Sequence, residues 1–98
     1  MSRRITITET RFEKNETASL EISGALGSLS LKRPDTIKAV VRISQIGDEF
    51  TVYVKAYSRT RETFRNLESF GSIEEAISSA NEFSAVLIQK GFKVTSIN

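Results

Sequence analysis

The dipeptide Gly47-Asp48 constrains the fold of this chain more than any other feature, because strand-like segments flank it on both sides. The segments Ile37–Ile46 and Glu49–Ser58 are rich in β-branched and aromatic residues that alternate with polar ones. Glycine at the first central position favours a two-residue type II′ turn. Such a turn pairs the two residues beside it and so fixes every later pair, because a one-residue slip would turn the apolar side chains outward.

This register gives the predicted hairpin one apolar and one polar face. The apolar face holds the pairs Ala39–Ala56, Val41–Val54, Ile43–Val52 and Gln45–Phe50. The polar face holds Lys38, Val40, Arg42, Ser44, Thr51, Tyr53, Lys55, Tyr57 and Arg59. Arg42 is then opposite Tyr53, and Lys38 is opposite Tyr57.

A further strand is expected from about Glu62 to Phe70, after a turn over Arg59–Arg61. Its register is left open, because Phe64, Leu67 and Phe70 do not share one alternation. The direction of the arginine side chains in this part of the chain is therefore left open too.

A long helix is predicted next. Ser72 and Glu75 form a capping-box pattern at its start, and Gly91 is a typical residue just after a helix end. The residues with helical spacing that would cover the sheet are Ile73, Ala76, Ile77, Ala80, Phe83, Ser84 and Leu87. A short final strand is expected over Phe92–Ile97.

The first part of the chain predicts a second hairpin. Arg3–Phe12 and Thr17–Gly24 read as strands joined by a two-residue turn at Lys14-Asn15. The stretch Gly24–Asp35 holds two of the five glycines and the one proline, and is expected to be a long loop with a short strand over Ser28–Leu31.

Together these elements predict an α+β fold: an antiparallel sheet of about five strands, one long C-terminal helix packed on one face, and a short final strand. The length of 98 residues suits a single domain over residues 1–98. The apolar share of 39% and the charged share of 27% are those of an ordinary soluble globular protein.

Catalytic signatures are missing from the sequence. Without cysteine or histidine, the chain lacks thiolate ligands, the commonest metal ligand and the usual general base. Neither a Gly-x-Ser-x-Gly nor a Ser-x-x-Lys pattern is present, and Gly24-Ala-Leu-Gly27 lacks the Gly-Lys-Ser/Thr ending of a phosphate loop. The sequence predicts a non-enzymatic binding protein with no catalytic residue, metal or cofactor.

The polar face of the hairpin is the candidate binding surface, because single-stranded nucleic acid is held by cations along its backbone and by aromatic rings under its bases. Tyr53 to Leu67 carries a local charge of +3, whereas Glu68 to Glu82 holds four glutamates and no basic residue. Single-stranded DNA or RNA is the expected partner. The candidate nucleic-acid-binding residues are Lys38, Arg42, Tyr53, Lys55, Tyr57, Arg59, Arg61 and Arg65.

Two other readings of this face are left open. A half-exposed sheet ordinarily carries Lys, Arg, Thr and Tyr on its solvated side. Tyr and Arg are also enriched at the hot spots of protein interfaces. The same face would then serve a protein-interaction module, such as an inhibitor or an accessory subunit.

The helical segment Phe83–Ile88 is apolar nearly all round and needs cover on two sides. The loop or the final strand would supply that cover, or a second copy of the chain would, with Val86 and Ile88 at a homodimer interface. The order of several strands followed by one long helix is similar to that of Whirly-type and coactivator-type single-strand DNA binders, which dimerise. This similarity extends to element order alone and to no signature residue.

The N-terminal Met-Ser-Arg-Arg leads into no apolar signal-peptide core, and no apolar run has the length that crosses a bilayer. A cytoplasmic protein without a membrane partner is therefore expected.

Overall fold

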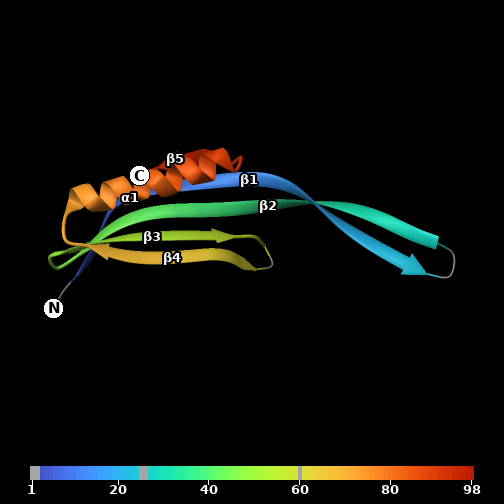
Figure 1. The fold of residues 1–98 in the computed structure, drawn as a ribbon, viewed down its shortest axis with the longest axis horizontal. Coiled ribbons are helices and arrows are strands. Elements are labelled where there is room, and N and C mark those ends of the chain that lie inside the picture. The colour runs from blue at the N-terminus through green and yellow to red at the C-terminus, as the bar shows by residue number, and fades with distance from the viewer. Residues whose placement is uncertain (1–2, 25–26, 60) are drawn as a thin grey trace.

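One antiparallel sheet of five strands, covered on one face by one helix, makes up the described fold in the computed structural model (Figure 1). The structure describes residues 3–24, 27–59 and 61–98, and only the backbone of residues 17–24 and 27–34. The elements are β1 (Arg4–Gly24), β2 (Gly27–Ile46), β3 (Glu49–Tyr57), β4 (Glu62–Phe70), α1 (Ile73–Gln89) and β5 (Lys93–Ile97). The strand order is β4-β3-β2-β1-β5, and the predicted α+β class is confirmed.

The hairpin of β2 and β3 has the predicted register, from the pair Ile46–Glu49 to the pair Lys38–Tyr57. Gly47 has a φ of 60°, whereas Asp48 has no positive φ. A type I′ turn needs positive φ at both central residues and a type II′ turn only at the first, so these angles fit the predicted type II′ turn.

The predicted hairpin at Lys14-Asn15 is wrong. β1 continues straight through this dipeptide, and Lys14 and Asn15 pair with Ile37 and Thr36 of β2. Lys-Asn is not one of the dipeptides that strongly favour a two-residue hairpin turn. The strand therefore continues and gains a ladder of backbone hydrogen bonds with β2.

The predicted loop over Gly24–Asp35 is also wrong. Only residues 25–26 separate β1 from β2, and the expected short strand over Ser28–Leu31 is part of the longer β2. The single proline, Pro34, is tolerated because β3 pairs with β2 only from Lys38 onward. Pro34 lies on a stretch of β2 with one neighbouring strand, where a missing N–H group is least costly.

We call residues 17–24 and 27–34 the arm, and the rest of the described chain the body. The arm is a two-stranded ribbon that extends well past the other three strands (Figure 1). The molecule is accordingly long and thin, with extents of 64 × 27 × 18 Å.

The hydrophobic core lies between α1 and the sheet. Phe12, Val52 and Val54 are its most deeply buried large side chains, and Ala76 and Leu87 of α1 pack against them. The helix begins where the sequence predicts, because the Ser72 hydroxyl accepts a hydrogen bond from the Glu75 backbone N–H at 3.3 Å. It ends at Gln89, and Gly91, predicted to lie just after the helix end, has a φ of 98° that suits this position.

The register of β4 explains why its three apolar residues do not share one alternation. Phe64 pairs with Ala56 and therefore lies on the α1 side, whereas Leu67 pairs with Tyr53 and lies on the opposite side. Phe70 pairs with Phe50 and returns to the α1 side. The strand therefore divides its apolar residues between the two faces of the sheet.

Candidate functional site

The sheet face that points away from α1 carries the predicted tyrosines; we call it the outer face. Tyr53 and Tyr57 lie there with Lys55 between them, because the register of β2 and β3 is the predicted one. The predicted Arg65, whose side-chain direction the sequence left open, lies on the same face and pairs with Lys55 from β4. A shallow groove of about 470 Å³ runs over this face and is lined by Arg4, Arg11, Val40, Arg42, Ser44, Ile46, Thr51, Tyr53, Lys55, Tyr57, Arg65 and Leu67. We call it the outer groove.

The floor of the outer groove is made of small side chains. Val40, Ser44 and Thr51 are buried although they point away from the core. The Thr51 hydroxyl lies 3.4 Å from the Ser44 carbonyl oxygen, to which it donates a hydrogen bond. Long Arg, Lys and Tyr side chains therefore stand around a low floor, and five of the twelve lining residues are cationic while none is acidic.

Two cations of this groove, Arg4 and Arg11, come from β1 and were not among the predicted site residues. They pair with Ile46 and Val40 of β2. The incorrect hairpin prediction paired the start of β1 with residues 17–24 instead of with β2, so these two arginines were not assigned to the outer face. Arg4 and Arg11 are seven residues apart, so regular alternation would place them on opposite faces of the sheet. A β-bulge between Thr6 and Thr8 brings them to the same face, and no local signal in the sequence marks that bulge.

The rings of both tyrosines have cations close to them. The guanidinium carbons of Arg42 and Arg65 lie 5.5 and 5.8 Å from the centre of the Tyr53 ring. The Lys55 ammonium lies 5.2 Å from the centre of the Tyr57 ring. These are cation–π distances, so the cations and rings hold one another in place.

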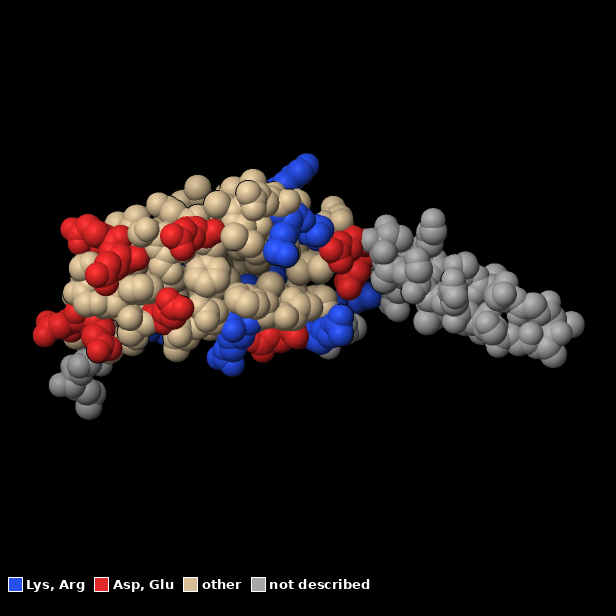
Figure 2. Space-filling view, viewed as in Figure 1, with Lys and Arg blue, Asp and Glu red and all other residues tan. Residues whose placement is uncertain are grey.

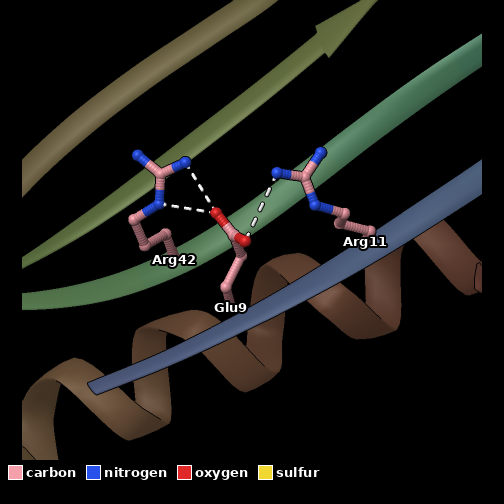
Figure 3. Close-up of polar contacts among 3 residues, drawn as sticks. All are labelled: Glu9, Arg11 and Arg42. Atoms are coloured by element: carbon pink, nitrogen blue, oxygen red, sulfur yellow. Dashed lines mark hydrogen bonds and ion pairs between the residues drawn. The ribbon is translucent and has the colours of Figure 1, made fainter. Parts of the chain in front are cut away.

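Glu9 of β1 ties two of the cations together (Figure 3). Its Oε1 accepts a hydrogen bond from Arg42 Nε at 2.8 Å and forms an ion pair with Arg42 Nη2 at 2.6 Å. Its Oε2 accepts a hydrogen bond from Arg11 at 3.3 Å. The hydrogen bond from Arg42 is the largest cause that lowers the pKa of Glu9, and the charges of both arginines add to it against partial burial. The charge of Arg42 is thus partly neutralised inside the protein.

The three remaining predicted cations do not line the outer groove and lie in two different places. Lys38 and Arg59 lie beside Tyr57 in an adjoining hollow of about 490 Å³, where Glu13 and Asp35 are also present. Arg61 is elsewhere: it lines a groove between α1 and the sheet. The structure thus brings seven of the eight predicted residues together along the outer face and its adjoining hollow.

The two residues predicted at a dimer interface lie on different sides of α1. Val86 and Ile88 are exposed by 45% and 54%. They are two residues apart on α1, which places them about 200° apart around the helix. The final strand β5 pairs with β1 at the sheet edge, and the expected covering loop is a strand. The homodimer stays a prediction.

Comparison with family models, with curated proteins and with solved structures finds no significant match. In the part of the chain that the structure describes, no helix is long and apolar enough to cross a membrane. Within that same part, acidic side chains form no group that could hold a metal ion.

Proposed function

We propose that the protein binds single-stranded nucleic acid along its outer face. The observation that carries this proposal is the outer groove, in which two tyrosines and five cations surround a low floor without an acidic lining residue. Single strands are bound by such a combination of positive groove and aromatic platform.

In this proposal the cationic side chains bind phosphates and the tyrosine side chains stack with bases. Lys55 and Arg65 form a cross-strand pair of β3 and β4 in the lining of the groove, and they contact phosphates of the bound strand. Tyr53 and Tyr57 stack under bases, each stacked base contributing about 1–3 kcal/mol. A base that stacks on Tyr57 takes the place of the Lys55 ammonium, which then turns to a phosphate.

Glu9 limits the affinity in this proposal. Arg42 contacts Glu9 at 2.6 and 2.8 Å in a half-buried pair. It is therefore less available to phosphate than Arg65, whose ion pair with Glu62 is longer, at 3.8 Å, and more exposed. Arg42 acts mainly by holding the Tyr53 ring, at 5.5 Å, in the orientation that a base meets.

A fluorescent oligothymidylate, which has little structure of its own, tests the proposal by anisotropy over a series of salt concentrations. With about four phosphates neutralised, the logarithm of the binding constant should fall with the logarithm of salt with a slope near −3. Tyr57→Ala should weaken binding by about tenfold or more, and Tyr57→Phe should keep most of it because the ring remains.

Two arginines of the β3–β4 region give a matched control. Arg65→Ala should weaken binding and reduce the salt slope by about 0.7. Arg61→Ala removes the same charge from the other side of the sheet and should change neither quantity much. Absence of binding at low salt, or equal effects of both variants, would contradict the proposal.

The protein-interaction alternative uses the same face and is the main competitor. Failure to bind any oligonucleotide, together with recovery from its host of one stoichiometric protein that survives nuclease treatment and is lost in Tyr57→Ala, would favour it. The proposal for either partner assumes a cytoplasmic protein, where both nucleic acid and protein partners are present.

A further inference from the structure

A second groove, of about 600 Å³, lies between α1 and the sheet on the side opposite the outer face; we call it the α1 groove. Its lining is mostly apolar and includes Ile37, Val54, Ala56, Phe64, Phe83, Val86, Leu87 and Phe92. Phe64 and Val86 are exposed by 48% and 45%, and the rings of Phe64 and Phe83 are 6.3 Å apart. Large apolar side chains are therefore left in contact with water at a recess.

Cations surround this apolar floor. Lys14, Arg61 and Lys90 line the groove, with Glu16 as the one acidic residue. Lys14 already pairs with Glu16 at 2.9 Å and lies 5.7 Å from the centre of the Phe92 ring. Within the described residues, no ion pair involves the side chains of Arg61 or Lys90.

The charges on this side of the molecule are unevenly distributed along its length. Figure 2 shows mainly acidic side chains toward the end where α1 begins, and basic side chains with some acidic ones among them toward the end where α1 finishes. The α1 groove lies at the second end, since Val86, Leu87 and Lys90 line it. An anionic ligand is therefore favoured there over a cationic one.

We propose that the α1 groove binds one small amphipathic carboxylate, with its apolar body on Phe64, Val86 and Leu87 and its carboxylate at Arg61 and Lys90. A volume of about 600 Å³ lies within the usual range for small-molecule sites, which are mainly apolar with a few placed polar groups. A guanidinium matches a carboxylate in shape and charge, and its hydrogen bonds to it are charge-assisted.

This site is independent of the proposed nucleic-acid site. The two grooves lie on opposite sides of the sheet and share no lining residue. Loss of one activity therefore leaves the other intact, and failure of either proposal is visible separately.

Calorimetric titration of the whole protein with decanoate, kept below its micelle concentration, tests the inference. Decanoate should bind saturably at one site per chain. Decyltrimethylammonium, which has the same tail and the opposite charge, should bind at least about tenfold more weakly because it meets two unpaired cations. Acetate, which lacks the tail, should not bind measurably.

Two pairs of variants locate the ligand. Val86→Glu places a charge on the apolar wall and should weaken decanoate binding by about tenfold or more. Ala85→Glu adds the same charge one residue away, at an exposed position outside the groove lining, and should leave decanoate binding unchanged. Arg61→Gln should weaken binding by about threefold, and Arg59→Gln should leave it unchanged.

Three results would overturn the inference. The first is no saturable binding, and the second is equal binding of the anionic and cationic amphiphiles. The third is a dimer by light scattering that excludes decanoate and becomes a monomer in Val86→Glu, because a second copy would then be the occupant of the groove.

Discussion

Glu9 is the residue on which the charge of the outer face depends most. Its carboxylate holds Arg42 and Arg11, and only 15% of its side chain is exposed. The hydrogen bond from Arg42, together with the charges of both arginines and the hydrogen bond from Arg11, favours the ionised form of Glu9, which is why its pKa is lowered. The same contact that orders the face also reduces its net charge.

Replacing Glu9 with Gln should lower the free energy of unfolding at pH 7 by about 1 kcal/mol, because Arg42 loses a charged partner in a half-buried position. Because the pKa of Glu9 is lower in the folded than in the unfolded protein, the ionised carboxylate stabilises fully above its ordinary pKa of 4.5. This stabilisation is lost as the pH falls through the lowered value. Urea unfolding at pH 7 and at pH 3 measures the difference.

Glu9→Gln should also tighten oligothymidylate binding at low salt, since Arg42 is then released to phosphate. Glu49→Gln is the control, because Glu49 is exposed and no ion pair joins it to the described residues. A stability difference from the original protein that stays constant between pH 7 and pH 3 would refute the assigned role of Glu9.

At the scale of elements, α1 has two apolar flanks with different neighbours. Val86 lies with Lys90 along the α1 groove. Ile77 and Ile88 are about three turns apart and share the other flank, where they are exposed by 45% and 54%. Any homodimer through the helix that leaves the α1 groove open must therefore use Ile77 and Ile88, and not the predicted pair.

The dimer prediction can be tested on this flank alone. If two copies pack through it, Ile88→Glu buries a charge in the interface and should convert the dimer to a monomer at micromolar concentration. Light scattering gives the mass directly, with Val86→Glu, on the opposite flank of α1, as the variant that should stay dimeric. A mass of one chain for the unaltered protein would remove the prediction.

At the scale of the whole molecule, the arm and the body have different sources of stability. The backbone of the arm pairs only within the arm, because β3 pairs with β2 only from Lys38 onward and β5 pairs with β1 only over residues 10–13. An isolated two-stranded ribbon is at best marginally stable in water. The body is therefore expected to fold without the arm.

Replacing residues 17–34 with Asn-Gly tests this independence. Glu16 and Asp35 are directly paired, so a two-residue turn joins them without changing the register. The thermal midpoint by circular dichroism should stay within about 5 °C, and oligothymidylate binding should persist. An unfolded product would show that the arm supplies contacts that the core needs.

Local signals in the sequence determined the parts of this fold that a few neighbouring residues can specify. Gly47 at a position of positive φ set the β2–β3 register, and with it the shared face of Tyr53, Lys55 and Tyr57. Ser72 and Gly91 set the two ends of α1 in the same way.

Only the tertiary structure decided which strand lies beside β1, because Lys14-Asn15 carries no conformational signal and the choice rests on pairing with residues far along the chain. That pairing brought Arg4 and Arg11 to the outer face. The structure likewise decided that Arg61 leaves this face for the α1 groove. Strand partners and side-chain faces at a turn are non-local properties, and a one-residue change in alternation moves a side chain from one side of the sheet to the other.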